Sequence, residues 1–291
     1  MKIIDGKQIA TNIKGEIATE VRAMIANGID PPHLVAILVG NDGASETYVA
    51  NKEKSCQEAG FISSVYKYPE NITEDELLKA IDFINDDPEV DGLIVQLPLP
   101  KHISANKVTH RIHPNKDVDG FHPENLGKLV LGEPTYIPAT PYGIIQLLEK
   151  SGIETEGKNA VVIGRSNIVG TPMSLLLSRN SKLGNCTVTI CHSKTRNLAE
   201  IAKTADILIV AIGKPEMITA EYVKKGAVVI DVGIHRIADE TKKSGFRLVG
   251  DVKFDDVVSQ ASYITPVPGG VGPMTIVGLL QNTLIAKKSK L

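Results

Sequence analysis

Hydrophobic and polar residues alternate along this chain in two patterns, one typical of buried strands and the other of amphipathic helices. Short, largely apolar segments rich in β-branched residues predict strands that are buried on both faces of a parallel sheet. Such segments occupy residues 34–39, 93–100, 160–163, 186–191, 207–212, 227–232 and 263–265. Because predicted helices separate most of them, we expect an α/β protein.

Between the strands, apolar residues recur every three or four positions, which is the spacing of a helix with one buried side. Glycines such as Gly28 and Gly60 mark helix ends, and Thr73 with Glu76 forms a capping box. Helices are predicted over residues 5–27, 44–59, 73–84, 140–152, 170–177 and 273–285. Residues 123–136 are rich in turn-forming residues and are expected to be a linker or an active-site loop.

The segment from residue 160 to residue 172 has the order strand, glycine turn and helix, which can form a binding site for a diphosphate. The apolar run ends at Gly164, and Gly170 precedes Pro172 at the start of the helix. A helix N-terminus offers backbone N–H groups and the positive end of its dipole to an anion. The dinucleotide fingerprint G-x-G-x-x-G requires a glycine where this chain has Ser166, so the motif alone fits a cofactor loop and an ordinary tight turn equally well.

Residues at the end of the next predicted strand indicate which dinucleotide would bind. NAD enzymes usually have Asp or Glu at that position, where it binds the ribose 2′-hydroxyl. This chain has Ser193 and Lys194 there, and Arg165 in the first turn. Cations and a hydroxyl would bind a 2′-phosphate that a carboxylate would repel, so the sequence favours NADP.

The composition restricts the class of protein. The 291 residues suffice for two domains, and 42% hydrophobic with 23% charged residues is typical of a soluble globular protein. A net charge of -2 argues against a general nucleic-acid binder. No apolar run approaches the roughly 18 residues of a membrane span, and the start lacks the apolar core of a signal peptide. The three cysteines do not resemble a disulfide framework, so we expect a cytoplasmic protein without membrane association.

Four further features could carry chemistry, although each has a simpler explanation. Tyr48 and Lys52 are four residues apart on a predicted helix, which is more often a solvated pair. Gln96 is the polar residue near the carboxyl end of a buried strand, where open α/β sheets bind ligands. Asp119 precedes a glycine, as turn residues often do, and residues 266–273 form a proline- and glycine-rich loop ahead of a helix.

Taken together, five motifs resemble the bifunctional methylenetetrahydrofolate dehydrogenase / methenyltetrahydrofolate cyclohydrolase family, and the resemblance covers essentially the whole chain. They occur in the family's order at residues 48–52 (YVANK), 91–100 (DGLIVQLPLP), 116–121 (KDVDGF), 164–170 (GRSNIVG) and 266–275 (PVPGGVGPMT). The resemblance implies an enzyme of one-carbon metabolism that oxidises 5,10-methylenetetrahydrofolate to 5,10-methenyltetrahydrofolate with NADP and then hydrolyses it to 10-formyltetrahydrofolate. It also implies a homodimer.

The resemblance assigns roles to individual residues. Lys52 would be the central catalytic group, and Gln96 would hold it and tune its pKa. Tyr48 would lie against the pterin, and Asp119 would bind the amino-pyrimidine edge of the pterin. The implied substrate-binding residues are Tyr48, Lys52, Gln96, Leu97, Asp119, Pro268, Gly269 and Gly270. The implied cofactor-binding residues are Gly164, Arg165, Ser166, Ile168, Ser193, Lys194, Gly213 and Ile234.

The hydrolytic step requires Lys52 to exchange protons at neutral pH. Water must attack the amidinium-like methenyl carbon, and protons must then move so that a ring nitrogen can leave. A lysine exchanges protons at neutral pH only if burial or a neighbouring cation lowers its pKa. We therefore predict that Lys52 is partly buried.

The predicted architecture has two domains with the active site in the cleft between them. Residues 1–140, together with the C-terminal helix 274–291, would form the folate-binding catalytic domain. Residues 141–273 would form a Rossmann-like NADP-binding domain.

Two other functions are compatible with parts of the pattern. An NADP dehydrogenase of the shikimate-dehydrogenase kind also joins two α/β domains and uses a lysine, but the spacing of Tyr48 and Lys52 and the strand with Gln96 argue against it. A non-catalytic NADP-binding regulator is disfavoured because Lys52, Gln96 and Asp119 are all present.

Three histidines, His110, His113 and His122, are close together in the sequence and invite a metal hypothesis. They come with neither a cysteine nor a clear carboxylate partner. The folate chemistry needs no metal, so none is expected.

Overall fold

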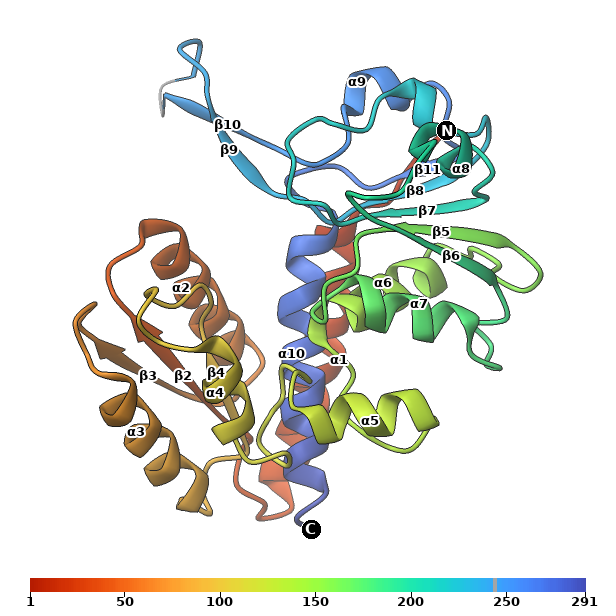
Figure 1. Cartoon of the computed structure of the whole chain (residues 1–291). Helices are drawn as coiled ribbons and strands as arrows, with labels where there is room; N and C mark the ends of the chain where they lie inside the picture. The colour runs from red at the N-terminus through yellow and green to blue at the C-terminus, as the bar shows by residue number, and fades with distance from the viewer. Residues whose placement is uncertain (243–244) are drawn as a thin grey trace. The chain divides into compact units, whose positions relative to one another are not determined.

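The computed structural model of this chain describes residues 1–242 and 245–291 (Figure 1). Its contacts define two units: unit 1 comprises Met1–Ala10 and Thr140–Thr275, and unit 2 comprises Thr11–Ala139 and Ile276–Leu291. The sequence assigned the first ten residues to the folate-binding domain. They belong to unit 1 because strand β1 (Lys2–Ile3) pairs in parallel with β11 (Tyr263–Ile264). Both units are built on parallel sheets, so the α/β prediction is confirmed.

Unit 1 contains a six-stranded parallel sheet in the order β1-β11-β8-β7-β5-β6. Its longer strands are β5 (Asn159–Ile163), β6 (Thr187–Cys191), β7 (Ile207–Val210) and β8 (Val228–Asp231). The chain passes from β5 to β6 on one side and returns to β7 on the other side of β5. Open α/β sheets bind ligands at the carboxyl ends of the strands where the order reverses in this way. The sheet therefore predicts a ligand site at the ends of β5 and β7.

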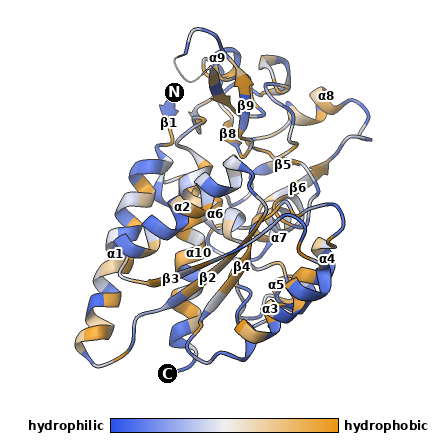
Figure 2. Cartoon of the chain, turned by 90° about the vertical axis from the view of Figure 1, so that its left-hand side faces the viewer, coloured by the Kyte–Doolittle hydropathy of each residue, from blue (hydrophilic) through white to orange (hydrophobic). Residues whose placement is uncertain are grey.

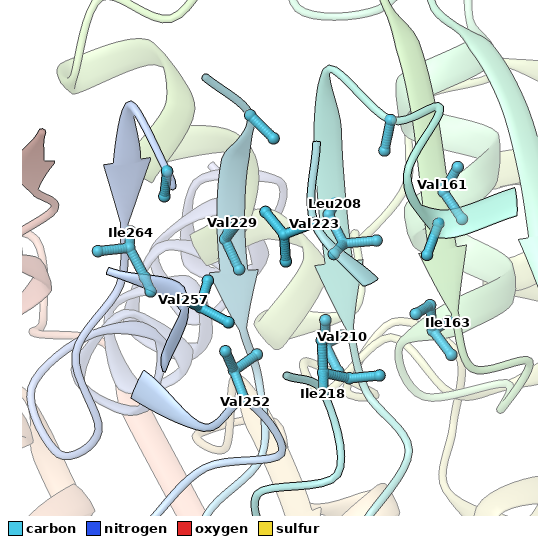
Figure 3. Packing of buried hydrophobic residues seen from close by; sticks show 14 of the residues in the cluster. Val161, Ile163, Leu208, Val210, Ile218, Val223, Val229, Val252, Val257 and Ile264 are labelled. Atoms are coloured by element: carbon cyan, nitrogen blue, oxygen red, sulfur yellow. The ribbon is translucent and has the colours of Figure 1, made fainter. Parts of the chain in front are cut away.

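Apolar side chains from both the strands and the covering segments form the core of unit 1. All residues of β7 and β8 are buried. Figure 3 shows one layer of this core, in which the strand residues pack against residues of the connections: Val161, Ile163, Leu208, Val210, Ile218, Val223, Val229, Val252, Val257 and Ile264. Burying one such side chain contributes about 1.5–3 kcal/mol, which is why these strands have no polar face in the sequence.

The helical segments of unit 1 cover the two faces of its sheet. They are α6 (Ala139–Lys150), α7 (Gly170–Ser178), α8 (Leu198–Ala202), α9 (Phe254–Val257) and the 3-10 turn η1 (Ala220–Tyr222). In Figure 1, α6 and α7 lie on one side of the sheet and α8 and α9 on the other. The antiparallel hairpin of β9 (His235–Ala238) and β10 (Phe246–Val249) was not predicted, because its strands lack a continuous apolar run.

Unit 2 contains a three-stranded parallel sheet in the order β3-β2-β4. Its strands are β2 (His33–Val39), β3 (Ile62–Tyr68) and β4 (Gly92–Val95). Strand β3 was not predicted, because it is an edge strand with polar residues such as Ser63 and Lys67 and no buried position. In Figure 2, β2 and β4 are coloured as hydrophobic, whereas α1 and α3 carry hydrophobic and hydrophilic residues in turn.

The remaining helices complete unit 2, although α1 and α10 also contribute residues to unit 1. They are α1 (Gly6–Ala26), α2 (Gly43–Glu58), α3 (Glu74–Asp86), α4 (Ala105–Arg111), α5 (Pro123–Leu131) and α10 (Val271–Lys288). The capping box of Thr73 and Glu76 is present at the start of α3. The expectation of a linker or loop over residues 123–136 is wrong for α5, in which Pro123 occupies the first turn and His122 accepts a hydrogen bond from the N–H of Glu124.

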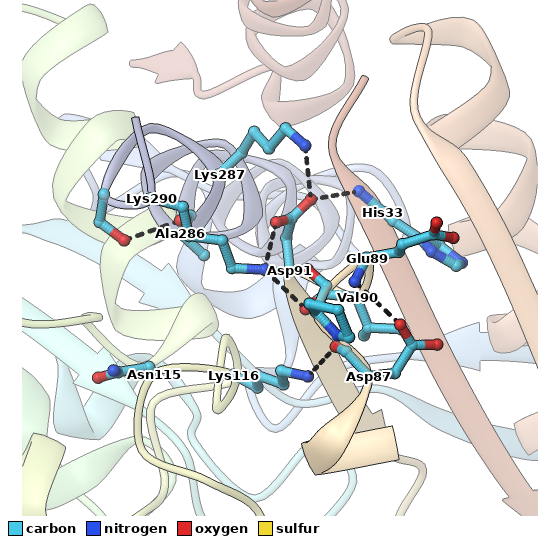
Figure 4. A network of polar contacts seen from close by, with 12 residues as sticks. His33, Asp87, Glu89, Val90, Asp91, Asn115, Lys116, Ala286, Lys287 and Lys290 are labelled. Carbon is cyan, nitrogen blue, oxygen red and sulfur yellow. Dashed lines mark hydrogen bonds and ion pairs between the residues drawn. The ribbon is translucent and has the colours of Figure 1, made fainter. Parts of the chain in front are cut away.

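A buried carboxylate, Asp91, connects the C-terminal residues to the segment before β4 (Figure 4). Asp91 is fully buried, and its Oδ2 accepts a 2.9 Å hydrogen bond from the N–H of His33. Lys290 Nζ lies 2.7 Å from Asp91 Oδ1 and donates to the carbonyl of Val90 at 3.0 Å. Lys287 Nζ lies 3.9 Å from Asp91 Oδ2. Two ammonium groups thus compensate one buried negative charge.

Replacing Lys290 with Met is expected to lower the free energy of unfolding by about 1–2 kcal/mol, because it removes the shorter of the two ion pairs of a buried carboxylate. Urea denaturation at neutral pH measures the change. The matched control is Lys288→Met, since Lys288 pairs with the exposed Glu20 and such pairs contribute about 0–1 kcal/mol. Equal effects of the two substitutions would contradict a special role for Asp91.

The three cysteines, Cys56, Cys186 and Cys191, are buried free thiols. Across residues 1–242 and 245–291, no helix combines the length and the apolar character needed to cross a bilayer.

Candidate active site

Helix α2 presents Tyr48 and Lys52 on the same face, as their spacing predicts. The helix begins after Asp42, whose carboxylate accepts a 2.8 Å hydrogen bond from the N–H of Ser45. Lys52 Nζ lies 4.7 Å from the centroid of the Tyr48 ring. An ammonium over an aromatic face is stabilised by the ring quadrupole, so this contact also orients the lysine.

Gln96 follows β4 and reaches the same amine. Lys52 Nζ donates a 3.3 Å hydrogen bond to Gln96 Oε1. Gln96 Nε2 donates to the carbonyl of Leu97 at 2.7 Å. Because the amide nitrogen is engaged by the backbone, the amide oxygen faces Lys52. Gln96 therefore presents a hydrogen-bond acceptor, and not a donor, to the amine of Lys52.

Lys52 is buried beside a carboxylate, which affects its protonation. Lys52 is only 6% exposed, so the prediction of burial is confirmed. Burial lowers the pKa of Lys52, and the negative charge of Asp119 opposes this change. Burial also raises the pKa of Asp119, while the charge of Lys52 acts to lower it. The two groups therefore lie close enough to influence each other's protonation.

A second carboxylate, Asp117, shapes the loop that carries Asp119. Its oxygens accept hydrogen bonds from the N–H groups of Phe121 (3.2 Å) and His122 (2.7 Å) and from Asn125 Nδ2 (2.9 Å). Burial raises the pKa of Asp117 to about 7. Of the two carboxylates in this motif, only Asp119 was predicted to be a site residue. Asp117 could have been found in the sequence, because it lies only two residues before Asp119 in the same short loop.

A small cavity adjoins the Asp119 loop in unit 2. It is lined by Leu93, Ile94, Val95, Leu97, Val108, Thr109, Ile112, Asp117, Asp119 and Phe121. Its volume of about 20 Å³ has room for about one water molecule and not for a pterin ring. The four predicted catalytic residues, and not this cavity, therefore define the candidate site of unit 2.

In unit 1, the turn after β5 has the close backbone packing of a dinucleotide loop. Gly164 has φ +136°, and a Cβ added there would lie 2.3 Å from the carbonyl oxygen of Ala211. A Cβ on Gly170 would lie 2.2 Å from the carbonyl oxygen of Gly164. At the position of the missing second glycine, the hydroxyl of Ser166 accepts a 3.1 Å hydrogen bond from the N–H of Val169. Helix α7 begins at Gly170, as predicted.

The residues predicted to bind a 2′-phosphate leave the sheet from neighbouring strands. Ile163 of β5 is paired with Cys191 of β6, and each chain continues from there into a loop. Arg165, Ser193 and Lys194 are each two or three residues beyond this pair, and all three are exposed. The parallel pairing therefore places both loops at the same edge of the sheet.

The other predicted cofactor residues follow β7 and β8. Gly213, with φ +68°, lies in the loop after β7, and Ile234, which is 61% exposed, lies between β8 and β9. Ile168 in the turn after β5 is 39% exposed. The residues predicted to bind NADP thus come from the ends of β5, β6, β7 and β8, at the carboxyl edge of one sheet.

The predicted substrate loop at residues 268–270 lies in unit 1, whereas the other substrate residues lie in unit 2. Gly269 has φ +103°, and its carbonyl accepts a 2.9 Å hydrogen bond from the N–H of Lys7. A Cβ on Gly6 would lie 1.9 Å from the carbonyl oxygen of Gly270. The N-terminal residues therefore help to hold this loop, and no pattern in the sequence indicated this contact.

The histidines that flank residues 116–121 make ordinary contacts. His110 Nδ1 lies 2.6 Å from the carbonyl oxygen of Asn106, and the rings of His110 and His122 are 6.2 Å apart. Within the described residues, no group of three or more His, Cys, Asp or Glu side chains is arranged to hold a metal ion.

Comparison with known proteins gives matches along the whole chain. Residues 4–119 match the model of the tetrahydrofolate dehydrogenase/cyclohydrolase catalytic domain, and residues 138–291 match that of the tetrahydrofolate dehydrogenase/cyclohydrolase NAD(P)-binding domain. The bifunctional protein FolD of Cytophaga hutchinsonii is 62% identical over 290 residues, which are 100% of both chains.

Solved structures agree with these matches. The bifunctional enzyme FolD (methylenetetrahydrofolate dehydrogenase/cyclohydrolase) from Campylobacter jejuni is 46% identical, with a TM-score of 0.93 and 100% of both chains covered. The FolD of Trypanosoma brucei, solved with NADP cofactor and inhibitor, is 38% identical, with a TM-score of 0.93 and 99% and 97% of the two chains covered.

Proposed function

This chain belongs to the tetrahydrofolate dehydrogenase/cyclohydrolase family, and on that basis we propose how its own residues carry the two reactions. The dehydrogenase oxidises 5,10-methylenetetrahydrofolate to 5,10-methenyltetrahydrofolate with NADP, and the cyclohydrolase hydrolyses the product to 10-formyltetrahydrofolate. The observation that carries the proposal is the buried amine of Lys52, hydrogen-bonded to Gln96 and electrostatically coupled to Asp119.

In the dehydrogenase reaction, the residues mainly position the reactants. NADP, when bound, accepts a hydride from the methylene carbon of the folate. Gly164 and Gly170 allow the backbone of the turn to pack closely ahead of α7. The N–H groups at the start of α7 would bind the diphosphate, and Arg165, Ser193 and Lys194 would hold the 2′-phosphate. Residues at the ends of β7 and β8, including Gly213 and Ile234, complete the cofactor site.

In unit 2, Tyr48 and Asp119 orient the folate. The ring of Tyr48 supports the flat face of the pterin. The carboxylate of Asp119 accepts hydrogen bonds from the amino-pyrimidine edge, which carries N–H donors. Leu97, in the same unit, supplies a further contact to the substrate. No acid or base is needed for hydride transfer itself, because the nitrogens beside the methylene carbon stabilise the cationic product.

In the cyclohydrolase reaction, Lys52 moves the protons. The neutral amine accepts a proton from the attacking water as the C–O bond forms at the methenyl carbon. The resulting ammonium then donates that proton to the ring nitrogen. The carbon–nitrogen bond breaks as the new hydroxyl releases its remaining proton to solvent, which leaves the formyl group on the other nitrogen. Gln96 accepts from the amine throughout and keeps it aimed at the reacting carbon.

A time course with 5,10-methylenetetrahydrofolate and NADP tests the proposal. NADPH and the methenyl product are followed together in the same reaction. We expect NADPH to form ahead of the methenyl product, because hydrolysis on the same chain removes the latter. If the two rise in step, the chain is a dehydrogenase alone and the role given to Lys52 is wrong.

The protein is also proposed to act as a homodimer in a reducing, cytoplasmic compartment. Three buried free thiols support the compartment. Strand β6 supports the dimer, because it is one of the two edge strands of the six-stranded sheet and leaves Ile190 44% exposed. Light scattering after size exclusion should give twice the mass of 31.3 kDa. Replacing Ile190 with Lys should then favour the monomer, and an unchanged dimer would place the interface elsewhere.

A further inference from the structure

We propose that Asp251, held by Asp231, is a positioning residue for the NADP site. It fixes the loop after β7, which contains the cofactor residue Gly213, and the start of β9, which directly follows the cofactor residue Ile234. The inference rests on the proposed cofactor site. Neither carboxylate was singled out in the sequence, and neither takes part in the reactions described above.

The carboxylate of Asp251 gathers donors from two separate segments of unit 1. It is fully buried. Its Oδ2 accepts hydrogen bonds from the N–H groups of Ile212 (2.7 Å) and Gly213 (3.1 Å), and its Oδ1 accepts from the N–H of Lys214 (2.8 Å). His235 Nε2 lies 2.7 Å from Oδ1. Three successive backbone N–H groups form a concave anion site, which here is filled by the protein's own carboxylate.

Asp231, the last residue of β8, holds the backbone of Asp251 in place. Its Oδ1 accepts hydrogen bonds from the N–H groups of Asp251 (2.9 Å) and Gly233 (3.0 Å), and its Oδ2 accepts from the N–H of Val252 (2.9 Å). Asp231 is itself 3% exposed. The backbone of Asp251 is therefore fixed by one carboxylate while its side chain fixes the next loop.

Two glycines make room for the pair. A Cβ on Gly250 would lie 1.8 Å from Asp231 Oδ2, and a Cβ on Gly233 would lie 2.5 Å from Asp251 Cγ. Any side chain at either position would displace a carboxylate. Gly213 itself has φ +68°, a conformation that favours glycine, and the hydrogen bond from its N–H to Asp251 holds it there.

The arrangement has a direct consequence for cofactor binding. Gly213 follows β7, which is the neighbour of β5 at the reversal of strand order where ligands bind in such sheets. Without Asp251, the N–H groups of residues 212–214 lose their shared acceptor, and the loop gains alternative conformations. Binding of NADP would then have to order the loop, which weakens affinity without changing the reacting groups.

The test is Asp251→Asn, measured in the full-length enzyme. An amide keeps one acceptor oxygen but turns an NH2 group toward backbone N–H donors. We expect the KM and Kd for NADP to rise tenfold or more, with kcat at saturating NADP and the KM for the folate changed by less than twofold. Hydrolysis of 5,10-methenyltetrahydrofolate without NADP should be unchanged, because Lys52 lies in the other unit. Asp256→Asn, in the exposed pair with Lys253, is the matched control.

The outcomes separate this inference from the proposed function. A lowered melting temperature with an unchanged Kd for NADP would show a purely structural role and overturn the proposal. If Asp251→Asn does not fold, His235→Gln removes a single contact and keeps the backbone hydrogen bonds. It should raise the Kd for NADP about threefold, and no change in that variant would overturn the proposal. Failure of the unmodified enzyme to bind NADP would instead contradict the proposed function.

Discussion

Replacing Lys52 with Met is expected to reduce the hydrolysis of 5,10-methenyltetrahydrofolate about a hundred- to ten-thousandfold, the usual contribution of a positioned acid–base group. Met has a similar length and no exchangeable proton, so it removes proton transfer and keeps most of the packing against Tyr48. NADP should still bind with unchanged affinity, because its predicted contacts lie in unit 1. Hydrolysis is measured by the loss of methenyl absorbance, and NADP binding by titration.

The control for this substitution is Lys54→Met on the same helix. The side chain of Lys54 is 74% exposed and lies 4.0 Å from Glu58, so its loss should leave hydrolysis unchanged. The Lys52→Met variant should also be at least as stable as the parent. Burial lowers the pKa of Lys52 in the folded state, so its charged form opposes folding at every pH below that lowered pKa. Retained hydrolysis in a folded Lys52→Met enzyme would exclude the lysine from the mechanism.

The direction of the pKa change of Lys52 also predicts how hydrolysis depends on pH. Since the neutral amine is the base, hydrolysis should increase with pH and level off below the ordinary lysine pKa of 10.5. Replacing Gln96 with Glu places a negative charge where Oε1 now lies 3.3 Å from the amine. It should raise the pKa of Lys52 and move the profile to higher pH. If the pH profile of that variant does not move, the rise of hydrolysis with pH does not report the ionisation of Lys52.

Replacing Arg165 with Ala is expected to weaken NADP about ten- to a hundredfold while changing the affinity for NAD by less than threefold. A charged hydrogen bond to the 2′-phosphate contributes about 1.5–3 kcal/mol, and NAD lacks that group. The exposed position of Arg165 in the turn after β5 is compatible with this contact. Titration of NADP and of NAD into the parent and into the variant measures the change in each affinity.

The exposed Lys203 at the end of α8 provides a control of similar charge. Lys203→Ala should leave both affinities unchanged, which excludes a general effect of net charge on dinucleotide binding. If Arg165→Ala weakens NADP and NAD equally, Arg165 shapes the turn and does not select the cofactor.

Local signals in the sequence were sufficient for most of the secondary structure. Strands that are buried on both faces, such as β5 and β7, have continuous apolar runs because water reaches neither side. The capping box of α3 was readable because it depends on residues three positions apart. Edge strand β3 and the hairpin of β9 and β10 were missed because their partners, and not an apolar face, define them.

Helix α5 shows the opposite failure. Its proline, glycines and asparagine suggested turns, yet Pro123 is compatible with a first helical turn and Gly132 ends the helix with φ +77°. The same residue types serve in loops and at helix ends, so composition alone could not distinguish the two. In the folded chain, Leu129 and Asn125 of α5 are buried. Asn125 Nδ2 donates to the carbonyl of Pro114 and to Asp117, and such tertiary contacts favour the helix.

By itself, the sequence determined the α/β class, the strands that are buried on both faces and the family, and it predicted the residues proposed to carry the chemistry. Each of these depends on neighbours in sequence or on motifs of fixed spacing. Only the tertiary structure decided that Lys52, Gln96 and Tyr48 meet at one amine and that burial lowers the pKa of that amine. It likewise revealed Asp251 as the acceptor of a loop almost forty residues earlier. Contacts between segments so distant along the chain leave no periodic pattern in either segment, since the distance in space is set by the packing of the whole sheet.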